Sequence, residues 1–279
     1  MSQQNTAISF DELYYLRTSH RRKIQFRNLL ILSAILLVVY WASVGTETSL
    51  GRFIDGLGFA YDFIGRALPL NFEFAHRIGY KLLETIAIAL LGTTFGIILA
   101  FPLAFFASRN VVGNPLICQS VRFVINGCRG ISEIVWAFLM VTAVGLGPFP
   151  GVLALTIHNA GALGKFFSET IENIDPGILE AVAAPGSNKI KLITRGILPE
   201  LMPMFTNYMF YYFEASVRQA TILGLVGAGG IGLEFIVLIK HLNYPAAMTV
   251  VLAMLLLVVA TDRTSAFVRK RLVASDLQR

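Results

Sequence analysis

The chain has 279 residues, of which 55% are hydrophobic and only 14% are charged, and its mean hydropathy is +0.66. Its uncharged runs are longer than those of a soluble core, so the composition indicates a polytopic membrane protein and argues against a soluble one. The net charge of +6 could indicate a nucleic-acid partner, but basic residues gather just before the first apolar run and just after the last one. Membrane orientation alone requires such basic flanks, so no nucleic acid is needed to explain them.

Six segments are long and apolar enough to span, or nearly span, a bilayer as helices. They cover residues 28–45, 82–107, 127–146, 151–172, 200–224 and 243–261. We therefore expect an all-α integral membrane protein with about six transmembrane helices. The first segment follows a basic and aromatic leader that is too long for a signal peptide, so it is interpreted as a retained helix.

Between the first and second segments, residues 51–68 place apolar side chains at helical spacing, with charged side chains elsewhere. This pattern predicts an amphipathic helix along the outer membrane interface. Residues 1–80 would then form a cytoplasmic leader, the first transmembrane helix and this interfacial segment, and residues 272–279 would form a cytoplasmic tail. Counting the basic residues of the loops places both termini in the cytoplasm, although the first outer loop is itself moderately basic.

Three pairs of opposite charges are spaced four residues apart within the predicted helices. They are Arg129 with Glu133, Lys165 with Glu169, and Glu214 with Arg218. Residues four apart lie on one helix face, so each pair can neutralise itself and lower the cost of insertion. A structural ion pair is the favoured interpretation. If these faces line a central path instead, Arg129 and Arg218 would attract an anion, and Trp136 would lie beside that path.

The connection between the fourth and fifth segments carries two short helix patterns, and residues 175–199 are predicted to form a helix-turn-helix. Asp175 and Pro176 are typical of a helix start. A small-residue face follows, and Gly186 turns the chain into a second helix that ends against Leu198 and Pro199. Small side chains permit close approach, so this unit suits a groove on a partner, whereas an ordinary connecting loop would not need an alanine face.

The sequences EAVAAPG (residues 180–186) and ILP (residues 197–199) resemble the EAA loop of ABC importer permeases. Val182 replaces the second Ala of that motif, and Gly196 stands where Ile is usual. In that family the loop forms the coupling helix that docks on the ATP-hydrolysing subunit. The resemblance therefore implies a coupling role for Glu180, Ala181, Ala184, Gly186, Leu198 and Pro199.

Further stretches narrow the resemblance, which runs from about residue 84 to residue 271. Residues 128–138, 144–155, 165–177 and 213–232 are similar to the permeases of phosphonate and phosphite importers. This implies a type I ABC importer permease domain over residues 81–271, in a bacterial inner membrane. It also implies a permease homodimer, two ATP-binding subunits that use ATP and Mg²⁺, a periplasmic substrate-binding protein, and no cofactor on this chain. A methionine-type or other small-solute ABC permease is the alternative.

A glycine cluster follows the fifth segment, and Gly227, Gly229 and Gly232 match the spacing of a dinucleotide-binding fingerprint. The cluster follows an apolar helix rather than a strand and lacks the downstream acidic residue, so nucleotide binding is rejected. A backbone break or re-entry near the outer mouth fits better, which makes Gly227, Gly229 and Gly230 candidates for a gate. Close packing between helices is an equally good interpretation.

Other function classes lack the residues that they would need. No Walker A sequence is present, so ATP hydrolysis is expected on a separate subunit. The four histidines and two cysteines do not show metal-ligand spacing, and no nucleophile and base cluster near a helix end, so neither a metal nor an enzyme activity is predicted. A self-contained secondary transporter would need no ATPase-docking loop and would often show two matching halves, which are not evident here.

Overall fold

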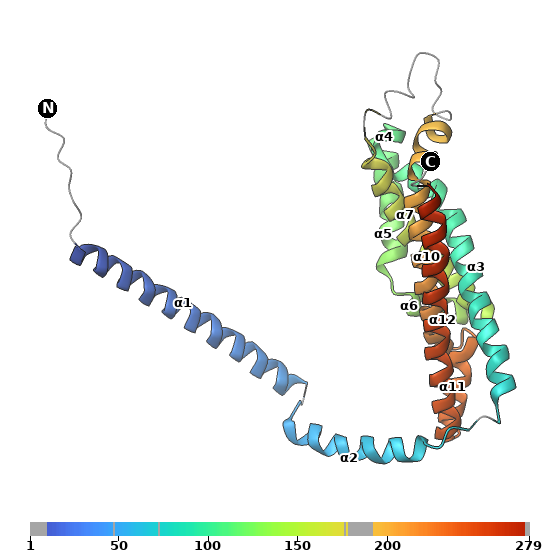
Figure 1. Cartoon of the computed structure of the whole chain (residues 1–279), viewed down its shortest axis with the longest axis horizontal. Coiled ribbons are helices and arrows are strands. Elements are labelled where there is room, and N and C mark those ends of the chain that lie inside the picture. The colour runs from blue at the N-terminus through green and yellow to red at the C-terminus, as the bar shows by residue number, and fades with distance from the viewer. Residues whose placement is uncertain (1–9, 47, 72, 176, 178–191, 277–279) are drawn as a thin grey trace. The chain divides into compact units, whose positions relative to one another are not determined.

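The computed structural model describes residues 10–46, 48–71, 73–175, 177 and 192–276 (Figure 1). The chain divides into two compact units, Met1–Gly65 and Arg66–Arg279. The first unit holds helix α1 (Phe10–Gly45) and most of the amphipathic helix α2 (Leu50–Ala67). The first predicted helix and the amphipathic segment are both confirmed as helices, and the retention of the first helix stays a prediction. The place of α2 at a membrane interface stays a prediction.

The second unit is a helix bundle, and no strand occurs in the described part of the chain. Its elements are α3 (Ala75–Ala107), α4 (Arg109–Val112), α5 (Pro115–Gly130), α6 (Glu133–Val144), α7 (Pro148–Glu172), the π-helical turn η1 (Leu192–Ile197), α10 (Leu198–Leu223), the 3₁₀ turn η2 (Gly224–Val226), α11 (Gly230–Lys240) and α12 (Tyr244–Asp276). Figure 1 shows α3, α5, α7, α10 and α12 running side by side, with α4 at one end and α11 at the other.

Four stretches of the described chain are long and apolar enough to cross a membrane: Ile24–Gly45, Ala75–Ala107, Ile193–Lys240 and Tyr244–Arg271. A fifth is counted if α5 and α6, which are bent by 88°, form one broken span. The predicted third span over residues 127–146 is therefore wrong as a single helix. Its chain breaks after Gly130, and Ser132 begins α6 by accepting a hydrogen bond from the Ile134 N–H at 3.4 Å.

Helix α7 is the centre of the bundle, and 16 of its 25 residues are buried. It packs against α3, α5, α6 and α10. The approach of α3 to α7 is close because Gly92 and Gly96 face it. A Cβ atom added to either glycine would lie 2.6 Å from the Cβ of Leu155 or Asn159, respectively. Paired small residues four apart allow this close helix packing in membranes. Helix α7 is not one of the four apolar stretches named above, and its burial among neighbouring helices allows it to run through the bundle without an apolar outer surface.

Two ends of the bundle matter for function. The end where α7 finishes and α10 begins, next to residues 178–191, is here named the loop end. The opposite end, where the α6–α7 turn meets the segment from Gly224 to Gly232, is named the glycine end. A hydrogen bond of 3.0 Å from the Gly147 N–H to the Gly227 carbonyl joins the turn to that segment.

Candidate functional site

The coupling residues predicted from the sequence fall partly inside the described structure. Glu180, Ala181, Ala184 and Gly186 lie outside the described residues. The structure does describe the two flanks of the loop. The Asp175 side chain accepts a hydrogen bond from the Gly177 N–H at 2.8 Å, which is the contact of an N-cap residue. The predicted helix that would follow it lies outside the described residues.

The other flank is the start of α10, where two of the predicted coupling residues lie. Leu198 is partly buried and packs against a core cluster of α3, α7 and α10, whereas Pro199 is exposed in the first turn. Ile197, immediately before them, is fully buried in the same cluster. A movement of the loop would therefore reach the core through Ile197 and Leu198.

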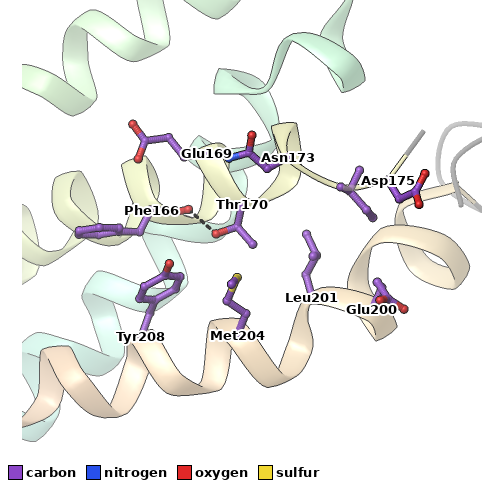
Figure 2. Close-up of a pocket in the computed structure, with 10 residues that line it drawn as sticks. Phe166, Glu169, Thr170, Asn173, Asp175, Glu200, Leu201, Met204 and Tyr208 are labelled. Atoms are coloured by element: carbon purple, nitrogen blue, oxygen red, sulfur yellow. Dashed lines mark hydrogen bonds between the residues drawn. The ribbon is translucent and has the colours of Figure 1, made fainter. Parts of the chain in front are cut away.

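A pocket of about 430 Å³ lies between these two flanks (Figure 2). It opens between the end of α7 and the first turns of α10. Its lining is acidic and aromatic: Phe166, Glu169, Thr170, Asn173, Ile174, Asp175, Glu200, Leu201, Met204 and Tyr208. The rings of Phe166 and Tyr208 stack with their centroids 5.1 Å apart at one side of it. The pocket thus separates the two helix ends that the loop connects.

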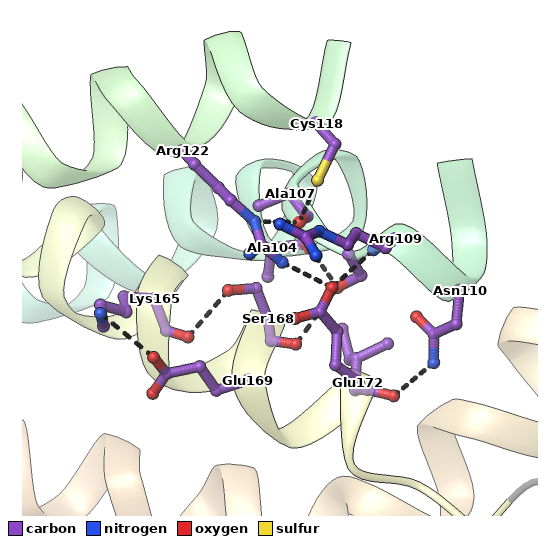
Figure 3. Close-up of polar contacts among 12 residues, drawn as sticks. Ala104, Ala107, Arg109, Asn110, Cys118, Arg122, Lys165, Ser168, Glu169 and Glu172 are labelled. Carbon is purple, nitrogen blue, oxygen red and sulfur yellow. Dashed lines mark hydrogen bonds and ion pairs between the residues drawn. The ribbon is translucent and has the colours of Figure 1, made fainter. Parts of the chain in front are cut away.

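A polar cluster fastens the end of α7 to α3, α4 and α5 on the other side (Figure 3). The Glu172 carboxylate accepts hydrogen bonds from the Arg109 N–H at 2.8 Å and from Arg122 Nη2 at 2.5 Å. Arg122 Nε also donates to the Ala107 carbonyl at 2.9 Å, and the Asn110 amide donates to the Ile171 carbonyl at 2.7 Å. Four elements are held together, so the loop end of α7 is a fixed point beside the pocket.

The sequence did not reveal this cluster. Glu172 is separated by 63 and 50 residues from the two groups that donate to it. Spacing along one helix finds partners only within a turn or two, so a pairing over that distance leaves no local pattern. The one available signal was the acidic residue at the end of a predicted span, opposite two arginines on the same predicted side of the membrane.

Of the three charge pairs predicted at a spacing of four residues, one is formed in the structure. Lys165 and Glu169 form their ion pair at 3.1 Å. The other two predictions are wrong. Glu214 lies 3.9 Å from Arg269 of α12, and Arg218 lies 3.9 Å from Asp262 of α12. Both residues of α10 thus have their ion-pair partners on α12, against which α10 packs.

The pair of Arg129 and Glu133 is also not formed. The break after Gly130 places Arg129 on α5 and Glu133 on α6, so the two residues do not share a helix face. Glu133 lies instead 4.0 Å from His158 of α7. Trp136 is also held at this break, since its indole N–H donates to the Cys128 carbonyl at 3.0 Å.

The glycine end is built on backbone that only glycine adopts readily. Gly227, Gly229 and Gly230 have φ angles of +89°, +77° and +72°, which separate α10 from α11. A Cβ atom at Gly229 would lie 2.8 Å from the backbone of Pro148 and 2.9 Å from the Glu84 carboxylate. The predicted break in the backbone is confirmed, and it coincides with close packing. The role of these glycines in gating stays a prediction.

Two side chains of α3 hold the first turn of α11. Glu84 accepts a hydrogen bond from the Gly230 N–H at 2.9 Å, and Thr85 Oγ1 accepts one from the Ile231 N–H at 2.8 Å. These donors are the amides that a helix start leaves unpaired. Lys81 pairs with the same Glu84 carboxylate at 2.6 Å. In the described ranges, no group of three metal-ligating side chains gathers here or elsewhere.

Comparison with known proteins shows the protein family. A family model described as "Binding-protein-dependent transport system inner membrane component" matches residues 92–273, which is more than half of the chain. The chain belongs to this permease family. As a member, the permease is a multi-pass protein of the inner membrane and a transport component, as predicted.

Relatives cover most of the permease. HtxC of Stutzerimonas stutzeri is 38% identical over 242 residues, which are 87% of this chain and 85% of HtxC. The phosphite transport system permease protein PtxC of the same organism is 32% identical over 86% of each chain. The phosphate-import permease protein PhnE of Mycolicibacterium smegmatis is 34% identical over 85% of this chain, but only 44% of PhnE is covered.

Solved structures show the same fold. One chain of the inward-facing MetNI methionine ABC transporter superposes with a TM-score of 0.65 at 20% identity, covering 74% of this permease and 99% of that chain. A chain of an amino acid ABC transporter gives a TM-score of 0.58 over 73% of this permease. The predicted all-α permease core of a type I ABC importer is confirmed.

Proposed function

We propose that this permease forms the membrane pathway of an ATP-driven, binding-protein-dependent importer of a phosphorus oxyanion such as a phosphonate or phosphite. The observation that carries the proposal is the identity to HtxC and PtxC over more than 85% of the chain, because a match of that length must include most of the helix bundle. A likeness confined to the coupling loop would indicate only a shared ATPase partner.

The partners follow from this function. The permease would work as a homodimer with two ATP-binding subunits and a periplasmic substrate-binding protein. ATP and Mg²⁺ would be used by the ATP-binding subunits, and this chain would hold no cofactor. The loop end would face the cytoplasm together with both termini, which agrees with the basic residues that flank the first and last apolar runs.

The geometry of the loop end suggests how ATP hydrolysis is transmitted. The polar cluster around Glu172 fixes the end of α7, whereas the start of α10 meets α7 across the acidic pocket. A coupling helix over residues 175–199, pulled by the ATP-binding subunits, would move the start of α10 through Ile197 and Leu198. The pocket gives that movement room.

Reconstitution tests the proposal. The permease is co-expressed with its ATP-binding subunit, purified, and placed in proteoliposomes with the binding protein outside. We expect ATP-dependent uptake of radiolabelled phosphite or methylphosphonate, and no uptake by the permease alone. Uptake without the ATP-binding subunit would indicate a secondary transporter. Uptake of D-methionine and of neither phosphorus compound would indicate a methionine-type permease.

A further inference from the structure

A second pocket lies beside the polar cluster around Glu172, where α4 meets the N-terminal part of α5. Its volume of about 330 Å³ falls within the range of roughly 300–1,000 Å³ that small-molecule sites occupy. Arg109 and Arg122 both line it, and no carboxylate of the described residues does, so we name it the basic pocket. The acidic pocket between α7 and α10 has the opposite character. The two pockets would therefore attract solutes of opposite charge.

One face of α5 supplies hydrogen-bond donors to the basic pocket. Gln119, Arg122 and Asn126 are spaced by three and four residues, so they lie on the same face of the helix. Gln119 and Asn126 are exposed, and their amide groups can donate N–H hydrogen bonds. A guanidinium group only donates. The pocket is thus rich in N–H donors and suits a ligand with several acceptor oxygens.

Arg122 is already fixed in position at this pocket. Its Nε donates to the Ala107 carbonyl at 2.9 Å, and its Nη2 donates to the Glu172 carboxylate at 2.5 Å (Figure 3). Its Nη1 makes no hydrogen bond within the described residues. A long side chain that is held before a ligand arrives does not have to be ordered on binding. Arg122 can therefore offer its remaining N–H groups at a small entropic cost.

The basic pocket carries an excess of positive charge. Arg122 pairs with Glu172, whereas Arg109 reaches that carboxylate through its backbone N–H at 2.8 Å. No carboxylate in the described part of the chain forms an ion pair with the Arg109 guanidinium. Two guanidinium groups are thus balanced by one carboxylate, and an anion in the pocket would supply the missing negative charge.

Apolar surface adjoins the basic pocket. The apolar stretch Ala75–Ala107, which is long enough to cross a membrane, ends two residues before Arg109. Phe123 lines the pocket and is 80% exposed, and Leu116 is 77% exposed. The polar groups therefore lie at the end of an apolar span, with large apolar side chains beside them.

We propose that the basic pocket binds a phosphoryl group through Arg109, Arg122 and the two amides of α5. The planar guanidinium presents paired N–H donors that match two oxygens of such a group. An anionic phospholipid carries this group, and basic pockets between transmembrane helices bind such headgroups. Free inorganic phosphate offers the same oxygens. Either ligand would neutralise the excess charge beside Glu172 and so strengthen the polar cluster that fixes the end of α7.

The test measures binding by the full-length permease purified in detergent. The Tm is recorded against the concentration of each probe at constant ionic strength, because a ligand of the folded state raises it progressively. Inorganic phosphate is one probe, with chloride as its reference. Phosphatidylglycerol is the other, with zwitterionic phosphatidylcholine as its reference. Neither measurement involves transport, so this inference and the proposed function can fail independently.

Arg109→Gln is the main variant, since it removes a guanidinium and keeps the backbone N–H that binds Glu172. Arg195→Gln is the matched control, because Arg195 is an exposed arginine of η1 at the same end of the bundle and does not line the pocket. Gln119→Ala and Asn126→Ala each remove one amide from the exposed surface of α5. They provide the test if Arg109→Gln does not fold.

A lost hydrogen bond to a charged group corresponds to a change of roughly tenfold to a hundredfold in Kd. We expect at least one probe to raise the Tm, Arg109→Gln to raise the apparent Kd of that probe at least about tenfold, both amide variants to raise it by a smaller factor, and Arg195→Gln to match the wild type. A response to inorganic phosphate identifies a free oxyanion site, and a response to phosphatidylglycerol alone identifies a lipid site.

Three results would overturn the basic pocket as a binding site. The first is a wild-type Tm that responds to neither probe. The second is an equal loss of binding in Arg109→Gln and Arg195→Gln, which would reflect surface charge alone. The third is an unchanged Kd in Arg109→Gln or, if that variant does not fold, in both amide variants.

Discussion

Replacing Glu172 by Ala should weaken the loop end of the bundle. The carboxylate accepts hydrogen bonds from the Arg109 N–H and from Arg122, and the Glu172 and Arg122 side chains are only 25% and 30% exposed. Each hydrogen bond to a charged group contributes about 1.5–3 kcal/mol, although partial exposure reduces this value. We therefore expect a loss of about 2–3 kcal/mol, because the substitution also leaves the Arg122 guanidinium without its counter-charge.

The loss of stability is measured by heating the purified permease in detergent and using size-exclusion chromatography to quantify the folded fraction at each temperature. A change of about 2–3 kcal/mol should lower the Tm by roughly 4–12 °C. Glu169→Ala is the control on the same helix. Glu169 is 51% exposed, and its pair with Lys165 should contribute well under about 1 kcal/mol. Equal Tm values for Glu172→Ala and Glu169→Ala would refute the reasoning, since the cluster would then not fix the end of α7.

Three further outcomes are expected. Glu84→Gln should leave the Gly230 N–H with a weaker acceptor, so backbone hydrogen exchange in the first turn of α11 should become about tenfold faster. Unchanged exchange would argue against a role for Glu84 in holding that helix. Arg218→Asp and Asp262→Arg should each reduce assembly of the permease into the complex, and the double variant should restore it. A double variant that assembles no better than the single variants would contradict a direct ion pair. Ala181→Trp should insert normally yet fail to retain the ATP-binding subunit in a pull-down, and normal retention would reduce the coupling loop to a passive connector.

The sequence predicted the position of the long apolar helices. Residues 82–107, 200–224 and 243–261 all fall on or within one residue of α3, α10 and α12, because length and hydropathy are properties of a single segment. The break inside residues 127–146 was missed. Gly130 and Ser132 are ordinary residues of an apolar helix pattern, and the bend depends on how α5 and α6 pack on α7.

Side-chain partners were harder to predict than helices. Lys165 and Glu169 could be paired from their spacing because both lie on one uninterrupted helix. Glu214 found its partner on α12, and Glu172 found its partners on α4 and α5, which no spacing rule indicates. The glycine end was predicted as a backbone break from its composition. That Glu84 and Thr85 hold the start of α11 became visible only when α3 was placed beside it.

The ion pairs between α10 and α12 have a consequence for how the chain is made. A carboxylate such as Glu214, which lies inside the apolar run of α10, makes this helix costly to release alone from the translocon into lipid. Arg218 and Glu214 on α10 supply opposite charges to Asp262 and Arg269 of α12. We therefore expect α10 to wait beside the translocon until α12 has been synthesised, so that the two helices leave it laterally with these charges paired. A chain truncated before residue 262 would then be a substrate for membrane quality control.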